Sequence, residues 1–138
     1  MSLPKIKYVS IFLETKKPLF EYKEEVNLNI QKVQKVIRRN ILDTGVKPFD
    51  NSSFKYEDFT FFYKNDSLIT AVCATDINYP NSTAFEFLDV LVKTFRSQYK
   101  EEDIRQAYSY SYNNSFKKTI KEKVTYYNKN LDSTNCSV

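Results

Sequence analysis

Two segments of the sequence are apolar at almost every position, and they constrain the fold more than any other feature. Ile6–Leu13 and Leu68–Thr75 carry apolar side chains at both odd and even positions. Because successive side chains of a strand point to opposite faces of a sheet, this pattern predicts strands that are covered on both sides. Helices must therefore pack on both faces of the sheet that contains these strands.

Three shorter segments complete the expected sheet. Leu19–Lys23 follows a turn after the first buried strand and forms a hairpin with it. Phe54–Tyr56 and Phe59–Tyr63 are short strands on either side of Glu57-Asp58, and a tight turn at Asn65-Asp66 leads into the second buried strand. These connections predict five strands with mostly antiparallel pairing.

Helical periodicity begins after the first hairpin. From Val26 to Ile41 apolar residues recur at spacings of three and four, which predicts one apolar stripe on a helix ending near Gly45, with Val36 and Leu42 widening the stripe. Lys32, Lys35 and Arg39 lie on the opposite face. The residues of the stripe are Val26, Ile30, Val33, Ile37 and Ile41.

Two further helices are expected in the second half of the chain. A helix capped by Asn81 or Ser82 and reaching Tyr99 has an apolar face wide enough to need more than one neighbour, over a length of about 27 Å. A later helix supplies that neighbour through a second apolar stripe. The residues of the second stripe are Phe116, Ile120, Val124 and Tyr127.

This order of elements predicts an α/β (α+β) fold. It is a three-layer α/β/α sandwich on a mostly antiparallel five-stranded sheet, with one helix on one face and two on the other. The 138 residues fit one domain, expected over residues 1–130, followed by a disordered polar tail over residues 131–138. No apolar stretch approaches the roughly 20 residues of a membrane span. Met1–Lys7 does not resemble a secretory signal, so we expect a cytoplasmic monomer.

The residues needed by common catalytic devices are absent or poorly placed. The chain has no His and one Gly, so it lacks the commonest general base and metal ligand as well as the glycines of a phosphate-binding loop. Cys73 lies within a buried strand and Cys136 in the polar tail, so we expect two reduced thiols without a catalytic partner. We therefore expect no enzyme activity, no cofactor and no metal.

The charge balance of the chain is mildly basic. A net charge of +4 does not require a nucleic-acid partner, and we expect none. Lys117, Lys118, Lys121 and Lys123 lie near the Tyr108–Tyr112 segment, but their helix also carries Glu122 and an apolar stripe. An ordinary amphipathic helix fits this pattern better than a nucleic-acid site, and a peripheral contact with anionic membrane is compatible with it.

Two stretches carry a resemblance to a known family. FTFFYKNDSLITAVCATDINYPNSTAFEFLDVLVKTFRSQY and AYSYSYNNSFKKTIKEKVTYYNKN resemble the longin domain, the amino-terminal regulatory module of long vesicle-type (R-) SNARE proteins, and are most similar to its tetanus-insensitive class. The resemblance covers Ile6 to about Asn130. It implies a longin/profilin-like sandwich and a non-enzymatic role in vesicle-mediated transport and membrane fusion, at the cytosolic face of endomembranes.

The resemblance also implies a partner-binding groove between the first helix and the third strand, occupied by the protein's own SNARE motif, that of another protein, or a trafficking adaptor. Val33 and Ile37 also suit the core, which makes Phe54, Tyr56 and Val36 the stronger candidates. Glu57-Asp58 stands where relatives often have a small residue, so the groove can differ in shape. Lys32, Lys35 and Arg39 beside it would steer an acidic flank of the partner. By position, the groove residues are Phe54, Tyr56, Val36, Val33, Ile37 and Asn40.

Several alternatives remain at this point. A subunit of a vesicle tethering or coat complex, similar to sedlin or to adaptor small subunits, shares the same architecture. A small enzyme or ligand sensor would need a pocket with convergent polar groups. A vesicle SNARE continues with about eight heptads and a membrane anchor, whereas Cys136 stands third from the end and does not fit a prenylation motif. The sequence is therefore interpreted as a fragment or a longin-only protein.

Overall fold

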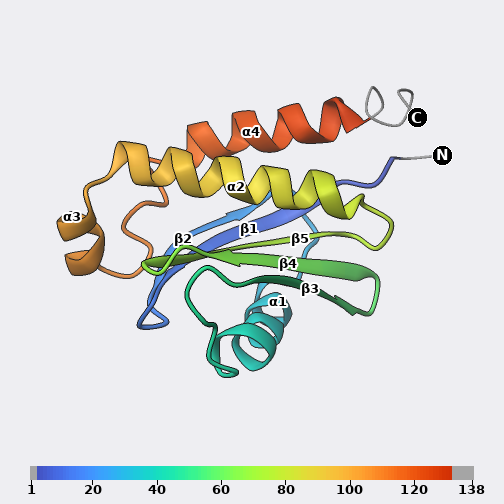
Figure 1. Ribbon diagram of the computed structural model, residues 1–138. Coiled ribbons are helices and arrows are strands. Elements are labelled where there is room, and N and C mark those ends of the chain that lie inside the picture. Colours follow the sequence, from blue (N-terminus) through green and yellow to red (C-terminus); the bar gives the residue numbers. More distant parts are fainter. Residues whose placement is uncertain (1–2, 132–138) are drawn as a thin grey trace.

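A computed structural model describes residues 3–131 and shows a five-stranded sheet between two helical layers (Figure 1). The strands are β1 (Ile6–Leu13), β2 (Pro18–Lys23), β3 (Asn51–Tyr56), β4 (Phe59–Asn65) and β5 (Ile69–Asp76). Their order in the sheet is β2-β1-β5-β4-β3, and every neighbouring pair is antiparallel. The predicted five-stranded sheet is confirmed, and β1 and β5 lie at its centre.

The helices divide between the two faces as the sequence predicts. They are α1 (Ile30–Ile37) with its π-helical continuation η1 (Arg38–Leu42), α2 (Asn81–Gln98), α3 (Glu101–Gln106) and α4 (Lys117–Lys129). In Figure 1, α1 lies below the sheet, while α2 and α4 run above it. The three-layer α/β/α fold is therefore confirmed. None of the helices in the described part of the chain is long and apolar enough to cross a membrane.

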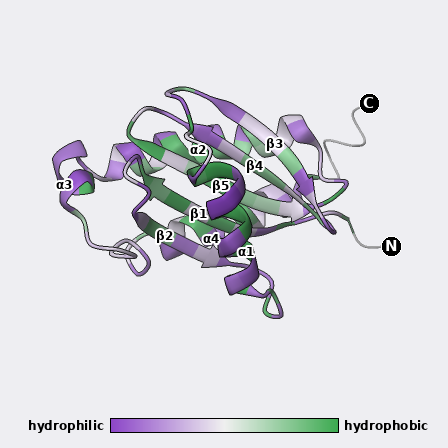
Figure 2. Cartoon of the chain, turned by 90° about the horizontal axis from the view of Figure 1, so that it is seen from below, coloured by the Kyte–Doolittle hydropathy of each residue, from purple (hydrophilic) through white to green (hydrophobic). Residues whose placement is uncertain are grey.

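The sheet separates two hydrophobic cores, and Figure 2 shows its central strands as mostly hydrophobic. On the side of α2 and α4, Phe87, Leu88 and Phe95 are fully buried, as the wide apolar face of α2 predicts. On the side of α1, Ile37 and Ile41 pack with side chains of β1, β4 and β5. Each central strand contributes side chains to both cores, which explains why apolar and polar residues do not alternate along it.

One aromatic cluster joins β2, α2 and the start of α4. Phe116 is completely buried, and its ring lies edge-on to Phe20 and Phe95 at centroid distances of 5.2 Å. Tyr99 and Tyr112 extend the cluster, with ring centroids 4.3 Å apart. The loop before α4 covers the outer edge of β2. The amides of Tyr110 and Tyr112 in this loop donate to the carbonyls of Pro18 and Leu19.

The two ends of the described chain are joined by one side chain. The backbone amide of Ile6 donates to Asn128 Oδ1 at 2.8 Å, and Asn128 Nδ2 donates to the Ile6 carbonyl at 3.2 Å. Asn128 lies in α4, while Ile6 begins β1. The last helix therefore pairs with the first strand through a backbone position that the sheet leaves available.

Two predicted helix starts are wrong. The first helix begins at Ile30 rather than Val26, because the Asn29 side chain caps it by accepting from the Lys32 amide; Val26 precedes the helix and is 81% exposed. Neither Asn81 nor Ser82 caps α2: both lie inside the helix, after Pro80.

The remaining differences concern the end of the chain and one short helix. Leu131, assigned to the disordered tail, is fully buried in the core beside α2 and α4; the rest of that predicted tail, residues 132–138, lies outside the described residues. The acidic run Glu101-Glu102-Asp103 forms the first turn of α3, where negative charge favours a helix start, and Ile104 anchors this helix to the core.

Candidate binding groove

A groove lies between the start of α1 and the tip of the β3–β4 hairpin. Its volume is about 340 Å³. The apolar side chains that line it come from three places: the segment before α1, the face of α1 toward the sheet, and the hairpin. They are Leu28, Val33, Val36, Tyr56, Phe59 and Phe61.

The periodicities of helix and strand explain why these side chains converge. Val33 and Val36 are three residues apart on α1 and share one face of the helix. Phe59 and Phe61 are two residues apart on β4 and share one face of the sheet. Tyr56 lies directly opposite Phe59 in the β3–β4 register, so its ring joins the same face. Tyr56 is 38% exposed and forms the accessible part of an otherwise buried apolar surface.

The structure brings Val33, Val36 and Tyr56 together in the groove, but not the other three predicted residues. Phe54 is half-buried and stacks on Phe61, with ring centroids 5.2 Å apart and an interplanar angle of 3°. Phe54 therefore lies beside Phe61 on the same face of the hairpin, next to the groove residues. Ile37 is fully buried in the core, as the alternative interpretation expected.

Asn40 lies outside the groove for a geometric reason. It belongs to η1, whereas the hairpin tip faces the first turns of α1. Its side chain is exposed and donates back to the Val36 carbonyl at 2.9 Å, one turn earlier in the same helix. This hydrogen bond to the helix backbone satisfies the Asn40 amide group, so its position does not require a binding partner.

Sequence reasoning missed Leu28, Phe59 and Phe61 as groove residues. The two phenylalanines carried a usable signal, since they alternate along β4 and pair with Tyr56 and Phe54 once the hairpin turn is placed at Glu57-Asp58. Leu28 had no such signal, because it precedes the helix in an irregular segment.

Two ion pairs border the groove. Lys32 Nζ lies 2.5 Å from Glu57 Oε1, so this pair links α1 to the hairpin tip. Lys7 Nζ lies 3.2 Å from Glu25 and 2.9 Å from Asp76, and 5.7 Å from the centre of the Phe59 ring. Each cation at the rim therefore has an acidic partner.

The environment keeps these cations charged. Burial lowers the pKa of Lys7, but hydrogen bonds and charges from Asp76 and Glu25 outweigh this effect, so its pKa is raised. The hydrogen bond that Lys32 donates to the Glu57 carboxylate raises the pKa of Lys32. Glu57 adopts a positive φ of 52°, which suits the two-residue hairpin turn and places this residue at the groove rim.

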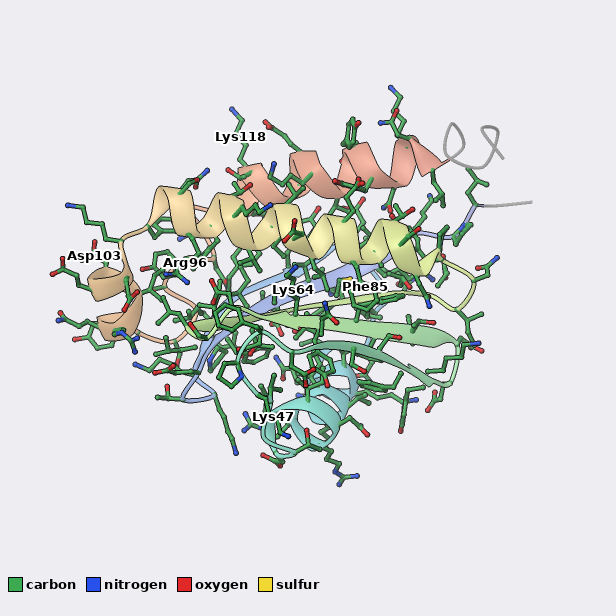
Figure 3. The ribbon with its side chains drawn as sticks, viewed as in Figure 1. Lys47, Lys64, Phe85, Arg96, Asp103 and Lys118 are labelled. Carbon is green, nitrogen blue, oxygen red and sulfur yellow. The ribbon has the colours of Figure 1, made fainter. Side chains whose placement is uncertain are left out.

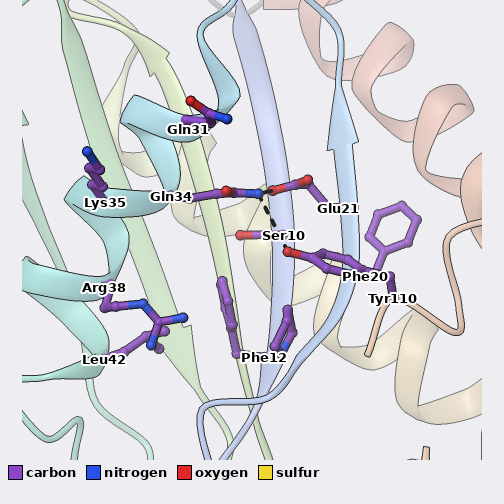
Figure 4. Close-up of a pocket in the computed structure, with 11 residues that line it drawn as sticks. Ser10, Phe12, Phe20, Glu21, Gln31, Gln34, Lys35, Arg38, Leu42 and Tyr110 are labelled. Atoms are coloured by element: carbon purple, nitrogen blue, oxygen red, sulfur yellow. Dashed lines mark hydrogen bonds between the residues drawn. The ribbon is translucent and has the colours of Figure 1, made fainter. Parts of the chain in front are cut away.

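A second hollow lies on the other side of α1, against β1 and β2 (Figure 4). Polar groups converge there: Gln34 Nε2 donates to Glu21 Oε2 at 2.9 Å and to the Tyr110 hydroxyl at 3.5 Å. Tyr8 also donates to Glu21 Oε2, at 2.5 Å, and burial together with the Glu21 charge raises the pKa of Tyr8. These groups satisfy one another, so the network fixes α1 to β2 and to the loop before α4.

The described residues contain no arrangement that suggests metal or nucleophile chemistry. No group of three potential metal-ligating side chains occurs among residues 3–131. Cys73 is fully buried in β5, and burial raises the pKa of its thiol, which disfavours the reactive thiolate. The apolar groove beside α1 is therefore the candidate site.

Comparisons with known proteins agree with the fold. Residues 19–120 match the family model Longin, described as a regulated-SNARE-like domain. The chain is also similar to vesicle-associated membrane protein 7B of Dictyostelium discoideum, with 30% identity over 92 residues, which is 66% of this chain and 35% of that protein. The match thus spans about a third of the relative's length. Because the family model covers most of the chain, from β2 into α4, the protein belongs to the longin domain family.

Proposed function

We propose that this protein is a non-enzymatic regulatory domain of vesicle-mediated transport and SNARE-dependent membrane fusion. It binds a largely apolar segment in the groove between α1 and the β3–β4 hairpin. The observation that supports this most directly is the exposed Tyr56 ring beside Val33, Val36, Phe59 and Phe61 in a longin domain. Exposed aromatic side chains grouped over an apolar floor favour protein recognition.

The chemistry of the groove favours an occupant with regularly spaced apolar side chains. An amphipathic segment can place its apolar side chains on Val33 and Val36, as helices do in hydrophobic grooves. An extended segment can use the outer edge of β3, which pairs only with β4 among the described strands. A SNARE motif, of this protein or of another, supplies such apolar side chains at regular spacing, as does a short adaptor segment.

The rim charges modify the earlier expectation of electrostatic steering. Lys32 is paired with Glu57, and Lys35 lines the hollow on the other side of α1. The rim therefore presents both signs of charge, so association depends weakly on salt. Charged side chains of the partner can replace the ion pair between Lys32 and Glu57 at the groove rim. The affinity of the partner comes from burial of its apolar side chains.

The similarity to a vesicle-associated membrane protein supports the SNARE context over a subunit of a tethering or coat complex. In that context the domain acts at the cytosolic face of vesicles or other endomembranes. Its partner is then a SNARE motif or a trafficking adaptor, and the domain itself is a monomer.

Tyr56→Glu tests the groove. The substitution places a charge on a 38% exposed position without emptying the core, so it should weaken binding of a vesicle SNARE-motif peptide by about 30-fold or more, with little change in the melting temperature. Tyr108→Glu is the matched control, because Tyr108 is 85% exposed and lies away from the groove. Chemical-shift mapping on the unmodified chain should locate the peptide between Val33 and Tyr56. Perturbations clustered on Lys117–Tyr127 instead would refute the groove assignment.

A further inference from the structure

The net charge of the protein is concentrated in one helix. The sequence of α4, KKTIKEKVTYYNK, contains five lysines and one glutamate, which together give +4. The whole chain also has a formal net charge of +4. The basic and acidic residues of the remaining sequence therefore cancel, and α4 carries the full imbalance.

The outer face of α4 displays this charge to solvent. Ile120, Val124 and Tyr127 form its buried stripe, so Lys118 and Lys129 lie on the opposite side at the 3.6-residue period. Figure 3 shows Lys118 pointing away from the sheet, and Figure 1 places α4 at the upper surface of the molecule. Lys118, Lys121 and Lys129 share an open surface with Tyr126 and with one acidic residue, Glu122. We refer to the three lysines and Tyr126 as the α4 face.

Within residues 3–131, the lysines of α4 form no ion pair, unlike seven other basic residues of the chain. Among the ion pairs formed within residues 3–131, none involves a lysine of α4. The basic residues that do form pairs are Lys7, Lys16, Lys32, Lys64, Lys93, Arg96 and Arg105. The charge on the α4 face is therefore available to an external anionic surface.

We propose that the α4 face docks on an anionic membrane surface. Lysine presents a mobile point charge that suits the diffuse charge of lipid headgroups, whereas arginine is preferred for paired contacts with individual phosphates. Tyr126 adds an aromatic side chain that is 58% exposed, and tyrosine is enriched at membrane interfaces. Its ring packs against Tyr127 at a centroid distance of 5.3 Å, which holds it at the surface.

The position of this face leaves the groove accessible. The groove lies beside α1, on the opposite side of the sheet from α4 (Figure 1). A domain docked through α4 thus presents its peptide-binding groove away from the lipid. Membrane docking does not rest on the proposed function, and each can be tested with the other intact.

The test compares two sets of substitutions that change the net charge equally. Lys118→Gln, Lys121→Gln and Lys129→Gln together remove three charges from the α4 face. Lys35→Gln, Lys47→Gln and Lys55→Gln remove three from exposed positions outside α4. Both triple variants are made in the full 138-residue chain, and circular dichroism verifies that each folds. Co-sedimentation with phosphatidylcholine vesicles, with and without about 30% phosphatidylserine, measures partitioning at low salt.

The α4 triple variant should bind phosphatidylserine vesicles about 100-fold more weakly, since each lysine near an anionic surface contributes about fivefold. The control triple should stay within about threefold of the unmodified chain, because charges beyond about 10 Å are screened. Equal losses in both triples would refute the proposal, as would equal binding to vesicles without phosphatidylserine. Binding of single-stranded DNA or an acidic peptide to the α4 face in place of vesicles would also refute it.

Two crossed measurements separate this proposal from the groove. The α4 triple variant should bind the SNARE-motif peptide normally, and Tyr56→Glu should bind vesicles normally. In the unmodified chain, a paramagnetic lipid should broaden the amide signals of Lys118–Lys129 more than those of α1. Broadening centred on α1 would contradict docking through α4, whatever the behaviour of the variants.

Discussion

Replacing Phe116 with alanine tests whether the aromatic cluster is the main connection between α4 and the rest of the domain. Phe116 lies immediately before α4 and is 0% exposed. Its ring contacts Phe20 of β2 and Phe95 of α2, both edge-on, and lies 6.1 Å from the ring of Tyr99. The substitution therefore removes contacts to two elements at once and leaves a cavity between them.

The expected loss follows from this burial. A fully buried Phe→Ala change costs about 3 to 5 kcal/mol, which includes the transfer free energy, the cavity and the lost ring contacts. This is a large part of a typical free energy of unfolding of about 5 to 15 kcal/mol. For a chain of 138 residues, 4 kcal/mol corresponds to a decrease in melting temperature of roughly 14 °C.

Thermal and urea unfolding followed by circular dichroism measure this loss. Tyr126→Ala provides the matched control, because it removes an aromatic ring from α4 at a position that is 58% exposed. The control should lose less than about 1 kcal/mol. If Phe116→Ala also loses less than about 1 kcal/mol, the cluster does not hold α4 to the domain and the assigned packing is incorrect.

Two further predictions concern the buried ionisable groups. In a Cys136→Ser background the Cys73 thiol should not react with a disulfide reagent until the protein unfolds, because it is 0% exposed and burial raises its pKa; rapid labelling of the native chain would contradict this. Stability should also fall as the pH rises above about 9. The unfolded chain then releases protons that the folded chain retains on Cys73 and Tyr8, whose pKa values are raised by burial. Urea midpoints that stay constant from about pH 8 to about pH 10 would refute this.

The sheet could be predicted from sequence because its central strands are unusual. β1 and β5 are apolar on both faces, and this pattern alone requires helices on both sides. The hairpin turns also predicted which strands lie next to each other in the sheet. The start of α1 could not be placed in the same way, because Val26 continues the spacing of the apolar stripe although Asn29 caps the helix after it. The hydrogen bond from the Lys32 amide to the Asn29 side chain sets the start of the helix, although the apolar spacing continues before it.

The groove was only partly predictable, because it depends on where helix and hairpin cross. The sequence indicates which side chains share a face, such as Val33 with Val36, but not which turn of α1 meets the tip of the hairpin. Asn40 was therefore placed on the wrong turn. Glu57 and Lys32 are 25 residues apart, and their ion pair is visible only in three dimensions.

The bond between Asn128 and Ile6 has a consequence for how the protein is made. Asn128 is among the last of the described residues to leave the ribosome, yet it completes the hydrogen bonding of the first strand. β1 also waits for β5, with Val9 paired to Cys73, before its two apolar faces are covered. Until then the nascent hairpin of β1 and β2 exposes a strand that is hydrophobic on both sides. Because these contacts join distant parts of the chain, we expect slow folding and an aggregation-prone nascent chain until nearly the whole domain has emerged.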